Sequence, residues 1–358
     1  MTKKFVLLVI ALALEVSLSW AGRIDRIQTD FSEALIDGNL ERAEELFKQG
    51  ADINDANIFS TTPLHKAVER NQMDVVKFLL KRGAEVDKQD QGGWTALHCA
   101  AWKNLPDVIS LLLKHGAKTS VTCKYGRTPL HIATMNGHLE VVKRLSDKTD
   151  LKLTDRDGHT AVEEAAFHGH ISLLNFFLKS GTTKVNRTSK YGHSLLTRAV
   201  QGGKQKTVEF LLDKGAKVYV KRSKFGALHT ATLYGYLEMV ELLLKRGAKV
   251  NQRVNCPEHD NDQETALHIA ADEGYFEIVR LLLENGAEVD LRDKLGRTPL
   301  FLAIQRGQEE IADLLLNYGA KPIIPAIDGT TVLHNAAAVN QYNSQRAKRL
   351  FPRLVVSE

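Results

Sequence analysis

Residues Thr128-Pro-Leu-His-Ile-Ala133 form a short motif that returns at regular intervals along the chain. Close copies begin at Thr62, Thr95, Thr265 and Thr298, and those at 62, 95 and 128 follow one another at one fixed step. Threonine caps the N-terminus of helices well, and proline is tolerated in the first helical turn because its missing N–H needs no partner there. The motif therefore predicts the start of a helix in every copy.

Weaker copies fill the gaps between these five, so the chain is an array of repeated units. One further step back from Thr62 reaches Thr29, which we take as the start of the first unit. A fixed period of this length is typical of repeat proteins, in which each unit buries its apolar face against its neighbours. The ten predicted units begin near residues 29, 62, 95, 128, 160, 194, 226, 265, 298 and 331.

The second half of each unit has apolar residues at helical spacing. Val75–Ala84 and Ile278–Ala287 are clear examples, and in both a Gly precedes the final Ala. Glycine is favoured where a helix ends in the left-handed conformation. Each unit is therefore predicted to contain a helix, a tight turn, a second helix and an extended loop.

This pattern resembles the ankyrin repeat, whose unit of the same length carries Thr-Pro-Leu-His at the first helix and Gly-Ala after the second. The resemblance covers residues 29 to about 337. It implies an all-α repeat, an ankyrin-type solenoid of about ten helix-turn-helix units with β-hairpin loops. It also implies that the motif histidines hold each turn through hydrogen bonds; these are His65, His98, His131, His229, His268 and His334.

The N-terminal residues have the features of an export signal. Lys3 and Lys4 precede an apolar run over residues 5–14, and Ser19-Trp20-Ala21 offers small residues before a cleavage site. This run is about half as long as a membrane-spanning helix must be. We expect cleavage after Ala21 and a periplasmic or secreted protein, with a membrane anchor formed by an uncleaved signal as the alternative.

The expected domain organisation has three parts: a signal peptide at 1–21, the array at 22–337, and a basic C-terminal cap and tail at 338–358. The three cysteines are too few and too scattered for a disulfide scaffold or a zinc ribbon. Equivalent histidines in neighbouring units lie about 10 Å apart, too far to share one metal ion. We therefore expect no catalytic residue, metal or cofactor.

The net charge of +5 does not argue for nucleic acid as a partner. Charge is nevertheless segregated: residues 179–224 hold twelve Lys and Arg against two acids, and residues 258–290 hold ten acids against one Arg. The electric field of two such oppositely charged regions can steer a charged partner. Two further departures from the repeat pattern, at Glu163-Glu164 and Thr197-Arg198, predict a less regular middle of the array.

In an ankyrin-like solenoid, the loop tips and the residues after the small pair of the first helix face the concave groove. Large aromatic side chains there are typical of interface hot spots. Packing of the tip aromatics on neighbouring loops is the alternative. The resulting partner-binding residues are Trp94, Trp102, Tyr125, Met135, Phe167, Tyr191, Phe225, Leu233 and Tyr234, with Phe59 at a further tip.

The leading functional hypothesis is a non-enzymatic, monomeric scaffold that binds a protein through this concave face. No membrane span is expected in the mature chain. The alternative is a regulatory or stabilising subunit of an exported enzyme or envelope complex.

Overall fold

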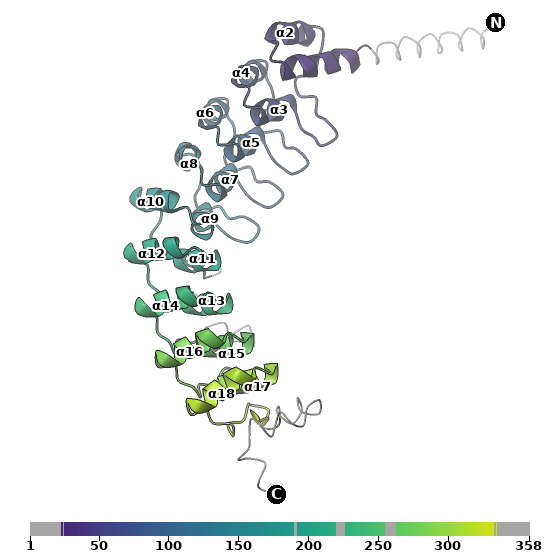
Figure 1. The fold of residues 1–358 in the computed structure, drawn as a ribbon. Coiled ribbons are helices and arrows are strands. Elements are labelled where there is room, and N and C mark those ends of the chain that lie inside the picture. The colour runs from purple at the N-terminus through teal and green to yellow at the C-terminus, as the bar shows by residue number, and fades with distance from the viewer. Residues whose placement is uncertain are drawn as a thin grey trace, which may run out of the picture. The chain divides into compact units, whose positions relative to one another are not determined.

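The computed structural model describes residues 23, 25–189, 192–219, 226–254, 263–332 and 334, and these form an all-α array of helix pairs (Figure 1). The predicted solenoid fold is thereby confirmed. The first helices of the repeats are α3 (Pro63–Glu69), α5 (Ala96–Trp102), α7 (Pro129–Met135), α9 (Ala161–His168), α11 (Leu195–Gln201), α13 (Ala227–Leu233), α15 (Ala266–Glu273) and α17 (Pro299–Arg306). The second helices are α2 (Leu40–Lys48), α4 (Met73–Lys81), α6 (Pro106–Lys114), α8 (Leu139–Ser146), α10 (Ile171–Lys179), α12 (Gln205–Asp213), α14 (Leu237–Lys245), α16 (Phe276–Glu284) and α18 (Glu309–Asn317).

The helices belong to two compact units, residues 1–161 and residues 162–358, which we call the N-terminal and C-terminal units. In the N-terminal unit, α5 packs between α3 and α7. Figure 1 shows α4, α6 and α8 on one side of these first helices and the long loops on the other side. In the C-terminal unit, α13 packs between α11 and α15, and α17 follows α15.

Motif histidines link five of the described first helices, α3, α5, α7, α13 and α15, to the following loop. In α5, Nδ1 of His98 accepts the backbone N–H of Thr95 at 3.2 Å, and Nε2 lies 3.0 Å from the carbonyl oxygen of Arg127. Because a carbonyl only accepts, the proton of this neutral ring is on Nε2. His65, His131 and His268 make the same pair of bonds. The predicted turn-holding role is confirmed for these four histidines, whereas within the described residues His229 keeps only the Nε2 contact, 2.8 Å from the carbonyl oxygen of Gln252, and His334 keeps only the Nδ1 bond to the Thr331 N–H.

The second helices supply much of the core. Helix α6 buries Val108, Ile109 and Leu112 completely or nearly so. Gly116 follows the end of this helix, and its φ of +86° allows the N–H of Ala117 to bond the Leu112 carbonyl at 3.0 Å. This is the glycine-ended helix that the sequence predicts.

The loops are hairpins closed by turn hydrogen bonds and joined to one another through the backbone. The N–H groups of Gln91 and Lys124 donate to the carbonyls of Phe59 and Gly92, each at 2.9 Å, and so connect consecutive loops. Extended pairing is limited to isolated bridges such as Thr154–Thr160, and the described segments contain no longer strand.

The first repeat differs from the others at its start. Thr29 lies inside a helix that runs over residues 25–36, and its hydroxyl donates to the Asp25 carbonyl at 2.8 Å. The first repeat therefore has no capped helix start at the motif position. The predicted signal peptide at 1–21, most of the long loop around Cys256, and the predicted tail at 338–358 lie outside the described residues. None of the helices within the described residues has the length and apolar character that crossing a membrane requires.

Two departures from the repeat pattern form a buried ion pair in the C-terminal unit. Nη2 of Arg198 lies 2.9 Å from Oε1 of Glu164, and their side chains are only 8% and 5% exposed. Both residues occupy the position that holds the buried apolar residues Cys99 and Ile132 in earlier repeats. The less regular repeats therefore contain a charge pair in place of an apolar contact.

Candidate functional site

Two tryptophans of the predicted binding surface meet in the N-terminal unit. Trp94 ends a loop and Trp102 ends α5, and their rings make an edge-to-face contact with centroids 6.2 Å apart. Trp94 is half-buried, whereas Trp102 is 47% exposed and has the ammonium of Lys103 4.5 Å from its ring. The contact holds the Trp102 ring in place, which lowers the entropy that it would lose on binding a partner.

The two described aromatic loop tips are open to solvent. Phe59 is 58% exposed and Tyr125 is 66% exposed. The Tyr125 ring lies 5.7 Å from the guanidinium of Arg127, two residues further along the same loop. Exposure of this size argues against the alternative that these side chains mainly pack on neighbouring loops. Tyr191 and Phe225 lie outside the described residues.

The apolar positions after the motif continue along the same unit. Met135 ends α7 and is half-buried. Ile36, at the same position of the first repeat, is 39% exposed, and the sequence reasoning missed it. Counting back two repeat steps from Trp102 would have found it. We call Ile36, Phe59, Trp94, Trp102, Tyr125 and Met135 the N-terminal apolar surface.

The predicted residues in the C-terminal unit divide into two kinds. Phe167 is half-buried, and the guanidinium of Arg198 lies 4.5 Å from its ring, so this phenylalanine packs between repeats. Leu233 and Tyr234 are 41% and 48% exposed. The Tyr234 ring stacks on Tyr236 with centroids 5.7 Å apart. Leu233 and Tyr234 are therefore the better placed of these three for contact with a partner.

A group of possible metal ligands lies in the loop before α9. Carboxylate and imidazole atoms of Asp155, Asp157 and His159 fall within 4.8 Å of one another. Oδ1 of Asp155 accepts the backbone N–H of His159 at 2.9 Å, which closes the hairpin. Asp90 closes its own loop in the same way, with the N–H of Trp94 at 2.8 Å. The buried aspartate thus has a structural explanation that needs no ion.

Burial also suppresses the reactivity of Cys99. Cys99 and Cys123 are both buried and form no disulfide. Burial raises the pKa of the Cys99 thiol to about 12, so little of the nucleophilic thiolate exists near neutral pH.

Comparisons with known proteins agree with this geometry. A family model described as ankyrin repeats matches overlapping segments from residue 31 to residue 350. The crystal structure of the human ASB11 ankyrin repeat domain is similar at 29% identity and a TM-score of 0.52, covering 63% of this chain and 98% of that one. A transient receptor potential cation channel subfamily A member 1 homolog from Caenorhabditis elegans is 30% identical over 103 residues, which are 29% of this chain.

The chain spans only about 8% of the length of that channel homolog, so the similarity concerns the repeats and not the whole channel protein. Ankyrin repeats generally mediate protein–protein interaction, and their fold is typically an interaction scaffold. With the family model matching most of the sequence, the chain belongs to the ankyrin-repeat family.

Proposed function

We propose that this protein is a non-enzymatic scaffold that binds a protein partner through the concave face of its repeats, with the N-terminal apolar surface as a principal contact. The observation that carries this proposal is the Trp94–Trp102 pair. It places a large, half-exposed aromatic ring against a second aromatic ring that supports it. Binding hot spots are enriched in such side chains.

The test uses three versions of the full chain as baits in its native source: the natural sequence, Trp102→Ala and Leu112→Ala. A protein held by the natural chain is then produced, and its affinity for each version is measured. We expect Trp102→Ala to weaken binding by about 2 kcal/mol or more, as at a hot spot. Trp102→Ala should lower the free energy of unfolding by less than Leu112→Ala does, because much of the Trp102 ring already faces solvent.

Leu112→Ala is the matched core control. Leu112 is fully buried, so its truncation leaves a cavity and should cost roughly 2 to 5 kcal/mol of stability. The folded Leu112 variant should bind the partner with unchanged affinity. If Trp102→Ala destabilises the fold as much as Leu112→Ala does and leaves the affinity unchanged, Trp102 is a packing residue and the binding surface lies elsewhere.

We further propose that the protein is exported. The support is the basic start, the short apolar run and the small residues before Gly22 in the sequence. Mass spectrometry of the protein from its native host should find Gly22 as the first residue. Replacing Leu7 and Leu8 by Arg should retain the chain in the cytoplasm, because export machinery reads the apolar run. An intact Met1 in the natural protein would instead indicate an anchored or unexported chain.

A further inference from the structure

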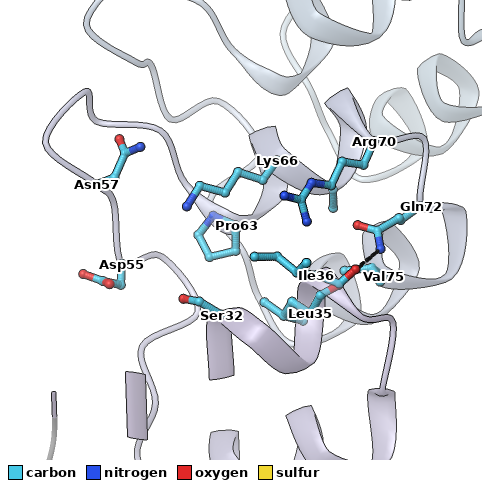
Figure 2. A pocket seen from close by; sticks show the side chains of 11 residues that line it. Ser32, Leu35, Ile36, Asp55, Asn57, Pro63, Lys66, Arg70, Gln72 and Val75 are labelled. Atoms are coloured by element: carbon cyan, nitrogen blue, oxygen red, sulfur yellow. Dashed lines mark hydrogen bonds between the residues drawn. The ribbon is translucent and has the colours of Figure 1, made fainter. Parts of the chain in front are cut away.

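A pocket of about 210 Å³ lies at the start of the N-terminal unit, between the helix of residues 25–36 and α3 (Figure 2). Leu35, Ile36, Pro63 and Val75 provide its apolar lining. A cavity of about 150 Å³ is large enough to hold benzene. This pocket can therefore accept one branched or aromatic side chain.

The repeat pattern explains why this space is open. Ser32 lines the pocket and stands one repeat step before His65, at the position of the motif histidine. In the next repeats that imidazole is buried and joins the helix start to the following loop. A serine is much smaller than a histidine, so the first repeat has a smaller side chain at this end of the pocket than the next repeats have at the equivalent position.

Two cationic side chains border the pocket. Figure 2 shows Lys66 and Arg70 extending from α3 above Pro63, Leu35 and Ile36. Within the part of the chain that the structure describes, neither side chain forms an ion pair or a hydrogen bond with another residue. Asp55 is the one carboxylate among the lining residues, and it is exposed at the rim. The lining thus has an excess of positive charge beside an apolar floor.

We infer that this pocket binds an acidic segment of the protein partner, with one bulky apolar side chain inserted between Leu35, Ile36 and Val75. A carboxylate flanking that side chain pairs with Arg70 and Lys66. Charge-assisted bonds from a guanidinium to a carboxylate are among the stronger polar contacts in proteins. The inference rests on the proposed scaffold function and adds the chemistry of the partner segment.

Charge complementarity favours a separate partner over the N-terminal residues of this chain. Residues 1–22 contain Lys3 and Lys4 but only Glu15 as an acid, so they match the cationic rim poorly. Ile36 belongs both to the pocket and to the N-terminal apolar surface. One extended partner segment can therefore occupy the pocket and continue toward Trp102.

The test titrates the full chain, labelled on isoleucine methyl groups, with three capped peptides in a Gly-Ser background. Their central residues are Asp-Leu-Glu, Asp-Ala-Glu and Lys-Leu-Lys, and Ile36→Val identifies the signal of Ile36. We expect a saturable shift of the Ile36 methyl with Asp-Leu-Glu, at millimolar affinity or better. The other two peptides should bind at least about tenfold more weakly, since each lacks one of the two contacts.

Matched variants separate the pocket from unspecific attraction. Arg70→Gln should weaken binding of the Asp-Leu-Glu peptide about tenfold. Lys77→Gln makes the same charge change on α4, outside the pocket lining, and should leave binding unchanged. Ser32→His should abolish binding by filling the space while circular dichroism shows a folded chain.

Two outcomes overturn the inference. The first is that the Ile36 methyl shows no saturable shift up to about 5 mM of the Asp-Leu-Glu peptide, a limit that corresponds to roughly 3 kcal/mol of binding free energy. The second is that the Asp-Leu-Glu and Lys-Leu-Lys peptides bind equally well. Trp102→Ala should not change peptide binding, because Trp102 does not line the pocket. A failed peptide titration therefore leaves the scaffold proposal standing if Trp102→Ala still weakens the natural partner.

Discussion

Lowering the pH from 7 to 5 is expected to destabilise the array by about 2 kcal/mol for each fully affected motif histidine. Burial lowers the pKa of His98, His229 and His268 from 6.5 to about 4, and it also lowers that of His65. A natural domain is stable by only about 5–15 kcal/mol. The summed effect is therefore a large part of the whole stability.

The sign follows from proton uptake. Between pH 6.5 and about 4 the unfolded chain protonates these histidines, whereas the folded chain keeps them neutral, so stability falls as the pH falls. The geometry gives a reason besides burial. Nδ1 of His98 already accepts the Thr95 N–H, and a proton on this nitrogen would place two donors face to face. Above pH 6.5 the histidines impose no such penalty.

Glu264 works in the opposite direction in the C-terminal unit. Burial raises its pKa from 4.5 to about 7, so the folded state takes up a proton there before the unfolded state does. Lowering the pH through this range therefore relieves a penalty and offsets part of the histidine effect. The N-terminal unit, with His65 and His98, is the cleaner place to measure the histidines.

Urea unfolding at pH 7, 6 and 5 measures the effect, and pH 5 keeps most carboxylates ionised. His98→Gln should be less stable at pH 7 but should lose less stability on acidification than the natural chain. His115→Gln is the control, because His115 is exposed at the end of α6. Equal unfolding free energies of the natural chain at pH 7 and pH 5 would show that the motif histidines protonate without cost.

The sequence predicts the helix pairs well because each local signal agrees with the repeat. In Thr128–Ala133, cap, first-turn proline and histidine all specify one helix start, and the structure has α7 there. Thr29 shows the limit of this reasoning. Its register is correct, but the helix begins before it, since nothing at residue 29 interrupts the preceding helical turn.

The candidate site was harder to predict from the sequence, because the exposure of a side chain depends on the residues that pack around it. Trp102 and Phe167 occupy equivalent positions, yet one is 47% exposed while the other packs against Arg198. The difference arises in the next repeat, where Arg198 covers the Phe167 ring. The pocket beside Ser32 was missed for the same reason, because a pocket depends on how the surrounding side chains pack and not on any single residue.

Replacing Arg198 by Met is expected to destabilise the C-terminal unit by about 3 to 5 kcal/mol, because it leaves the Glu164 carboxylate buried without its cation. The side chain of Arg198 also bonds Gln201 at 2.9 Å and covers the Phe167 ring, so the packing of α11 is affected too. His168 is 3.4 Å from the other oxygen of Glu164 and would compensate in part if it were protonated. Urea unfolding at pH 8, where an imidazole is normally neutral, should therefore reveal the full cost.

A double variant distinguishes loss of the charge partner from loss of packing. Glu164→Ile with Arg198→Met replaces the pair by apolar side chains, and the same position holds buried Cys99 and Ile132 in the N-terminal unit. Replacing a buried ion pair by apolar residues of similar volume is often neutral or stabilising. The double variant should therefore recover most of the stability that Arg198→Met loses. If it is as unstable as the single variant, the cost comes from the lost packing of the arginine side chain and not from the loss of the cation beside Glu164.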